Sequence, residues 1–66
     1  MIKLRLNKEI YSNENILKAV EAYESYAQMS IKEDVNHCIL CFVDCKYDEV
    51  RTIKEFENYL IGLENS

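Results

Sequence analysis

The most apolar stretch of this chain, residues 37–46 with the sequence HCILCFVDCK, restricts most strongly what the protein can fold into. A length of roughly eight residues, together with β-branched and aromatic content, favours a strand over a helix. Side chains alternate across a strand, so Ile39, Cys41 and Val43 project from one face while Leu40 and Phe42 project from the other. Both faces of this strand are therefore apolar, and each needs a covering partner.

Apolar spacing predicts the remaining elements. Residues 2–7 alternate as in a half-buried strand, and residues 13–28 have the three- and four-residue spacing of an amphipathic helix, capped by Ser12 or Asn13. A short strand around residues 29–32, a turn over 33–36 and a last helix over about 49–63, capped by Asp48, complete the chain. The order is βαββα, so we expect an α+β fold with a three-stranded sheet and two helices packed on one face.

The length of 66 residues predicts a single small domain over 1–66. A chain this short buries only about 60% of the surface that it exposes when unfolded, so we expect marginal stability. Disulfides, a metal ion or a partner subunit often add stability to such domains.

The charge of the chain argues against some classes of partner. Its net charge is −4, and its basic residues are scattered, which disfavours nucleic-acid binding. No apolar run approaches the ~20 residues that span a bilayer, and the alternating N-terminus differs from a signal peptide. We therefore expect no membrane partner and a cytoplasmic location, where cysteines stay reduced.

Three cysteines, Cys38, Cys41 and Cys45, invite a metal hypothesis, because thiolates at similar spacings bind zinc or iron–sulfur clusters. Strand alternation places Cys38 on one face and Cys41 and Cys45 on the other, and the latter two would stand ~13 Å apart. His37 shares the Cys41 face but is still further from Cys45. We expect the three thiols to serve as small apolar residues, with no metal and no cofactor.

Candidate catalytic groups are few. His37 is the only histidine and has no evident acid–base partner in the sequence, so a structural role is the better interpretation. The only glycine, Gly62, cannot form a glycine-rich phosphate loop. We expect no catalytic residues and no enzyme activity.

The second apolar face of the strand over 37–46 is the positive clue to function. If both helices cover one face of the sheet, Ile39, Cys41 and Val43 stay open to water, and such patches often mark interfaces. A homodimer or another protein partner would cover them, and an edge strand could accept an extended peptide. Alternatively, the long side chains of Lys3 and Arg5 cover the patch.

The segment EFENYL, with Glu55, Phe56, Asn58 and Leu60, resembles the Glu-Phe-x-Asn-x-Leu signature near the C-terminus of HxsD-like proteins. The stretch YSNENILKAVEAY also resembles that family, because it matches the family's Tyr-x-x-x-x-Ile-x-Lys-Ala-x-x-x-Tyr pattern at Tyr11, Ile16, Lys18, Ala19 and Tyr23. The likeness extends from about residue 3 to residue 63. The cysteine-rich strand has no counterpart in these motifs.

HxsD-like proteins are small components of His-Xaa-Ser peptide systems, and the resemblance implies a role rather than a reaction. They accompany radical S-adenosylmethionine maturases that modify ribosomally made peptides. The chain would be an accessory protein that binds the maturase, the precursor peptide or both, and the iron–sulfur cluster would belong to the maturase. No catalytic residue is carried over. Glu55 and Asn58 would hydrogen-bond either within the fold, which we favour, or to a partner.

Two other classes stay open at this point. One is a stand-alone interaction module, such as an antitoxin or an immunity protein, whose acidic surface meets a basic partner. The other is a small metal or redox protein that uses the cysteines.

Overall fold

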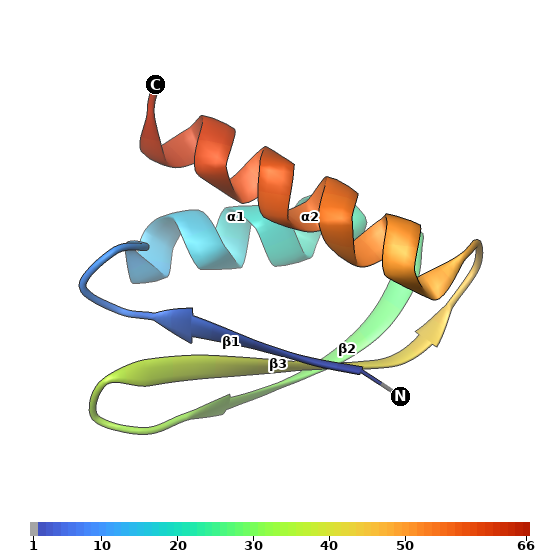
Figure 1. The fold of residues 1–66 in the computed structure, drawn as a ribbon, viewed down its shortest axis with the longest axis horizontal. Coiled ribbons are helices and arrows are strands. Elements are labelled where there is room, and N and C mark those ends of the chain that lie inside the picture. Colours follow the sequence, from blue (N-terminus) through green and yellow to red (C-terminus); the bar gives the residue numbers. More distant parts are fainter. Residues whose placement is uncertain (1) are drawn as a thin grey trace.

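The computed structural model describes residues 2–66, which form three strands and two helices in the predicted order (Figure 1). The elements are β1 (Ile2–Asn7), α1 (Asn13–Tyr23), β2 (Ala27–Glu33), β3 (His37–Cys45) and α2 (Glu49–Glu64). The predicted α+β fold, βαββα with a three-stranded sheet, is confirmed.

The most apolar stretch of the sequence forms the central strand of the sheet. The strand order is β1-β3-β2, and β3 runs antiparallel to both neighbours. Directly paired residues of antiparallel strands project to the same side of the sheet. Leu40 of β3 pairs with Leu4 of β1 and with Ile31 of β2, so these three side chains share one face.

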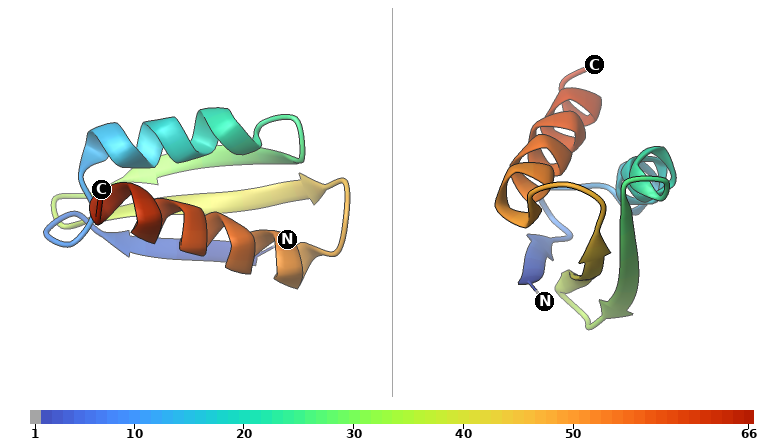
Figure 2. Two further views of the ribbon diagram at one scale, coloured as in Figure 1. Left: turned by 90° about the horizontal axis from the view of Figure 1, so that it is seen from above. Right: turned by 90° about the vertical axis from the view of Figure 1, so that its right-hand side faces the viewer.

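Both helices lie on the same side of the sheet, with α1 along β2 and α2 over β1 (Figure 2). Each begins at a polar cap that the sequence predicts. The hydroxyl of Ser12 accepts a hydrogen bond from the backbone N–H of Asn15, and the carboxylate of Asp48 accepts one from that of Arg51. These caps satisfy N–H groups that the first turn of a helix leaves without a partner.

The core lies between the sheet and the helix pair. Leu40 and Phe42 of β3 are fully buried, as are Ile16 of α1 and Phe56 and Leu60 of α2. The rings of Phe42 and Phe56 meet edge to face with their centroids 5.5 Å apart, which joins α2 to the central strand. One apolar face of β3 is thus covered by the helices, as predicted.

The predicted helix over 13–28 is too long, because α1 ends at Tyr23. Residue Ala27 continues the helical spacing of the sequence, but it is the first residue of β2 and pairs with Cys45. The backbone carbonyl of Tyr26 accepts a hydrogen bond from the N–H of Lys46, which extends this contact. Pairing with the long central strand therefore overrides the local apolar spacing and makes β2 longer than expected.

Candidate functional site

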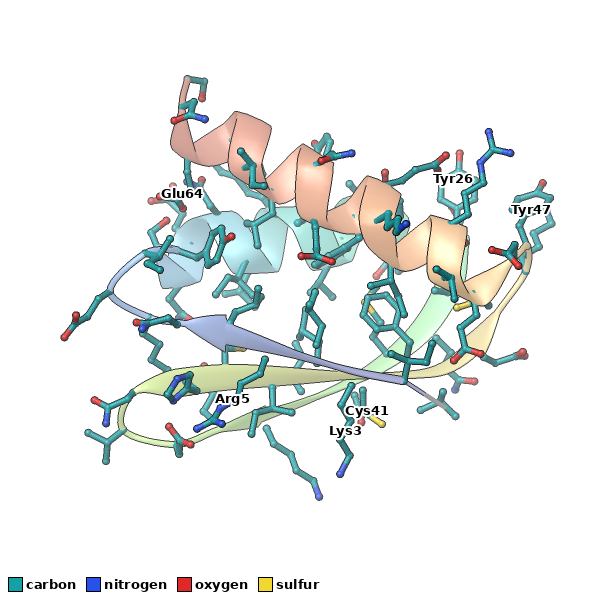
Figure 3. The ribbon with its side chains drawn as sticks, in the orientation of Figure 1. Lys3, Arg5, Tyr26, Cys41, Tyr47 and Glu64 are labelled. Atoms are coloured by element: carbon teal, nitrogen blue, oxygen red, sulfur yellow. The ribbon has the colours of Figure 1, made fainter. Side chains whose placement is uncertain are left out.

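The side of the sheet opposite the helices is an exposed surface with an apolar centre. We define the open face as seven residues of the three strands: Lys3, Arg5, Ser30, Lys32, Ile39, Cys41 and Val43. Figure 3 shows Lys3, Arg5 and Cys41 projecting from this side of the sheet. Six of the seven, all but Arg5, line a shallow hollow of about 450 Å³.

The apolar residues of the open face remain accessible to water. Ile39 and Cys41 are half-buried, and the side chain of Val43 is 50% exposed. Lys3 lies beside them at the edge of the hollow, but it is itself exposed. The basic side chains therefore flank the apolar centre and leave it open, so the predicted group Ile39, Cys41 and Val43 forms one continuous surface.

A β-bulge interrupts the pairing of β2 with β3 and changes the direction of the side chains that follow. Gln28 pairs with Asp44 and the next residue, Met29, pairs with Phe42, so Val43 is the extra residue of β3. The extra residue shifts the alternation of side chains by one position. Cys45 consequently packs against the core, on the same side of the sheet as Phe42.

The expectation that Cys41 and Cys45 share a face is therefore wrong, and the bulge is the physical reason. Cys41 lies on the open face, whereas Cys38 is buried and Cys45 packs against the core. Burial raises the pKa of the Cys38 and Cys45 thiols, and for Cys45 the charges of Glu49 and Asp44 add to the effect. Within residues 2–66, no group of three or more His, Cys, Asp and Glu side chains is placed to hold a metal ion together.

The two polar residues of the EFENYL segment lie in the helix layer, away from the open face. Glu55 is exposed and accepts a hydrogen bond of 3.2 Å from the Nε of Arg51, one turn earlier in α2. Asn58 is exposed, and its side chain makes no hydrogen bond with another residue of the described chain. The structure therefore does not bring Glu55 and Asn58 together with Ile39, Cys41 and Val43.

Four tyrosines gather around the C-terminal end of α1 and the connection from β3 to α2, which sequence reasoning did not anticipate. The ring of Tyr23 lies 5.8 Å from that of Tyr26 and 5.8 Å from that of Tyr59, and Tyr26 lies 6.3 Å from Tyr47. Figure 3 shows Tyr26 and Tyr47 close to the start of α2. The residues come from different elements, so only the packing of α1 against α2 and the pairing of β2 with β3 could have revealed the cluster.

The tyrosine cluster also adjoins Glu55. Burial raises the pKa of the Tyr23 hydroxyl, and the negative charge of Glu55 raises it further. Glu55 and Tyr47 both line a second, more polar hollow of about 320 Å³. Tyrosine is enriched in protein interfaces because its ring is apolar and its hydroxyl is polar. The end of the molecule that carries Glu55 is therefore a second candidate surface.

His37 is the first residue of β3 and directly follows the turn that joins β2 to β3. The carboxylate of Asp34 accepts hydrogen bonds from the backbone N–H groups of Asn36 at 2.8 Å and His37 at 2.6 Å, which lower the pKa of Asp34. The His37 Nδ1 lies 3.7 Å from the same carboxylate. This arrangement is typical of a turn that a short acidic side chain stabilises.

Neither described helix combines the length and the apolar character needed to cross a bilayer. Comparison of the chain with protein-family models, with curated proteins and with solved structures found no match.

Proposed function

We propose that this chain is a non-catalytic accessory protein of a radical S-adenosylmethionine system that matures ribosomally made peptides, and that it binds the maturase, the precursor peptide or both. The observation that carries the proposal is the open face. Its apolar centre, Ile39, Cys41 and Val43, has no covering element among residues 2–66. A small domain that leaves such a surface open fits a role in which a partner covers it.

The sequence resemblance to HxsD-like proteins supports the choice of system. In the EFENYL segment, Phe56 and Leu60 are fully buried, while Glu55 and Asn58 are exposed. The apolar positions of the motif thus build the core, and its polar positions remain accessible to a partner. Glu55 adjoins the tyrosine cluster, so an accessory protein with two partners would have a second surface for the second one.

The environments of His37 and Cys38 favour binding over catalysis. The carboxylate of Asp34 accepts a hydrogen bond from the backbone N–H of His37, which stabilises the turn before β3. The Cys38 thiol is buried with a raised pKa, which makes it a poor nucleophile. These features support a structural role for both groups.

The experiment is a pull-down from the native host lysate with this chain as bait, read by mass spectrometry. Two baits test the open face. Val43→Asp places a charge at its apolar centre, and the matched control Ile61→Asp places the same charge on the exposed side of α2, where Ile61 is 42% exposed. Circular dichroism verifies that both variants fold. We expect the wild type and Ile61→Asp to recover a radical S-adenosylmethionine enzyme or a small precursor peptide, and Val43→Asp to lose it.

Other results would overturn the proposal in distinct ways. Recovery of untagged copies of the same chain, and of no other protein, would indicate a homo-oligomer that covers its own open face. Recovery of a basic protein unrelated to peptide maturation would support a stand-alone interaction module, such as an antitoxin or an immunity protein. The exposed acidic side chains of the helix layer, among them Glu14, Glu21 and Glu24, favour this second candidate, and its binding would weaken strongly with salt.

A further inference from the structure

The open face is basic, although the chain as a whole is acidic. Lys3, Arg5 and Lys32 all project from this side of the sheet and are exposed, whereas the net charge of the protein is −4. Two acidic residues lie at the ends of the face: Asp44 follows Val43 at one end, and Asp34 lies in the turn at the other, where backbone hydrogen bonds, helped by the charges of His37 and Arg5, lower its pKa. A partner that is complementary to this surface therefore carries negative charge.

The strand register arranges these cations on both sides of an apolar strip. Ile39 in β3 pairs with Arg5 on one side and with Lys32 on the other. Cys41 pairs with Lys3 and with Ser30 in the same way. Neighbouring strands lie about 4.8 Å apart, so the cationic edge strands are separated by roughly 10 Å. The strip between them runs from Ile39 to Val43, which corresponds to ~13 Å of extended chain.

The shape and charge of the open face discriminate among occupants. A second copy that docked face to face would bring the basic side chains of one copy close to those of the other, which is repulsive. An extended peptide lying flat on the strip would find no neighbouring strand to pair with its backbone N–H and C=O groups, so the sheet would satisfy none of them. An α-helix satisfies its own backbone and has a diameter of about 10–12 Å, comparable to the separation of the two edge strands.

We propose that the open face binds an acidic amphipathic helix of a partner protein or peptide. Its apolar stripe lies on Ile39, Cys41 and Val43, and its flanking carboxylates pair with the basic side chains of β1 and β2. At 1.5 Å of rise per residue, the strip accommodates about nine helical residues. Asp44 and Asp34 repel carboxylates from the two ends of the strip, so the acidic residues of the helix concentrate along its middle, beside Lys3, Arg5 and Lys32. This inference rests on the proposed function, because it names the chemistry of the partner that the open face takes.

The first test uses synthetic peptides of defined chemistry. A twelve-residue, end-capped amphipathic helix with a leucine stripe and glutamates on both flanks is titrated into the ¹⁵N-labelled protein, alongside peptides that carry glutamine or lysine instead of glutamate. We expect amide shifts concentrated at residues 3, 5, 30, 32, 39 and 41. We also expect at least tenfold tighter binding of the glutamate peptide than of the glutamine peptide, and the weakest binding for the lysine peptide.

The second test changes the protein. The double variant Lys3→Glu/Lys32→Glu reverses two charges of the open face, and the control Lys18→Glu/Lys54→Glu makes the same change in net charge on the exposed sides of α1 and α2. After circular dichroism has verified folding, we expect the first variant to bind the glutamate peptide at least tenfold more weakly. The control should change binding by less than threefold.

Several results would overturn the inference. The first is a set of amide shifts confined to the tyrosine cluster. The second is binding of the lysine peptide as tight as that of the glutamate peptide, and the third is an equal loss of affinity in both double variants. Tighter binding of a twelve-nucleotide oligothymidine at the open face would indicate nucleic acid, and dimerisation through this face would indicate a second copy. If the peptides fail while the pull-down recovers a maturase through another surface, only this inference is wrong. If the peptides bind as expected and no maturation component is recovered, only the proposed function is wrong.

Discussion

At the scale of single residues, the three cysteines differ in burial and should therefore differ in reactivity. Thiolates react and thiols do not, so a raised pKa and low accessibility both slow alkylation. Burial raises the pKa of Cys38 and Cys45, whereas Cys41 lies on the open face. We expect iodoacetamide to modify Cys41 first and Cys38 last in the native protein, as followed by peptide mass spectrometry. Alkylation in urea provides the control, because the three cysteines should then react at equal rates. Faster modification of Cys38 than of Cys41 in the native protein would contradict the burial pattern.

The side chain of Phe56 tests how far the stability depends on one contact. Phe56 is fully buried and meets both Phe42 and Tyr23 edge to face, each at 5.5 Å between ring centroids. Truncation of a buried Phe to Ala costs about 3–5 kcal/mol, while a domain of this size has a total stability of roughly 3–10 kcal/mol. We expect Phe56→Ala to be largely unfolded by circular dichroism, or to unfold at much lower urea concentration.

The control for this change is Ile61→Ala, in the same helix at a position that is 42% exposed. Exposed substitutions usually alter the free energy of unfolding by less than about 0.5 kcal/mol. Similar losses for both variants would mean that the core does not depend on Phe56.

The assignment of residues to the two sides of β3 could be predicted as far as Val43, because strict alternation applies up to that residue. After Val43, the extra residue of the bulge, the alternation is shifted by one position, so Cys45 points to the core. No local sequence signal marks this bulge, since neither Gly nor Pro occurs in β3. Strict alternation therefore places Cys45 on the wrong face of the sheet. The three thiols are nevertheless divided between the two sides, as the argument against a metal site requires.

At the scale of elements, the bulge itself leads to a prediction about deletions. Removal of Val43 would let Asp44 follow Phe42 directly, which restores regular pairing with β2 and keeps Cys45 on the core side. We therefore expect the Val43 deletion to retain the fold with a modest loss of stability, measured by circular dichroism and urea unfolding. Deletion of Cys41, within the regular ladder, should abolish folding because it moves one half of β3 to the opposite face. An unfolded Val43 deletion would show that the bulge is required for the sheet.

Local sequence signals were sufficient to predict where the helices begin, but not where α1 ends. Ser12 and Asp48 cap α1 and α2 as the sequence predicts, because short polar side chains bond N–H groups within their own turn. The end of α1 was not predictable in this way. Ala27 fits the helical spacing but belongs to β2, because its pairing with Cys45 depends on a partner eighteen residues further along the chain. Local spacing contains no information about such a partner.

At the scale of the whole molecule, the order of elements and the one-sided helix layer could be predicted, and so could the open face at Ile39, Cys41 and Val43. Alternating strands and amphipathic helices were sufficient for these features. Two features of the candidate surfaces depend instead on the strand order and on the packing of the helices. The basic edge strands flank the apolar strip only because β3 lies between β1 and β2, and the tyrosines meet only because α1, α2 and the end of β3 converge.

The two helices are also joined at the opposite end of the molecule, where Glu64 at the end of α2 caps the start of α1 (Figure 3). Its Oε2 accepts hydrogen bonds from the backbone N–H of Ser12 at 2.8 Å, the Ser12 hydroxyl at 3.1 Å and the Asn15 amide at 2.8 Å. The side-chain bond from Asn15 and the backbone bond from Ser12 lower the pKa of Glu64. A carboxylate beside a helix N-terminus also interacts favourably with the helix dipole.

This link predicts a pH dependence of folding stability. Because the pKa of Glu64 is lower in the folded than in the unfolded chain, its contribution is fully present above the unfolded pKa of about 4.3 and is lost as the pH falls below that value. Glu64→Gln should therefore be less stable than the wild type at pH 7, and the difference should shrink as the pH approaches 3. Urea unfolding at several pH values measures both curves. The substitution Glu9→Gln, at an exposed position, provides the control for loss of one negative charge. If the curves of unfolding free energy against pH for Glu64→Gln and the wild type stay parallel down to pH 3, the Glu64 carboxylate contributes nothing as a charged group.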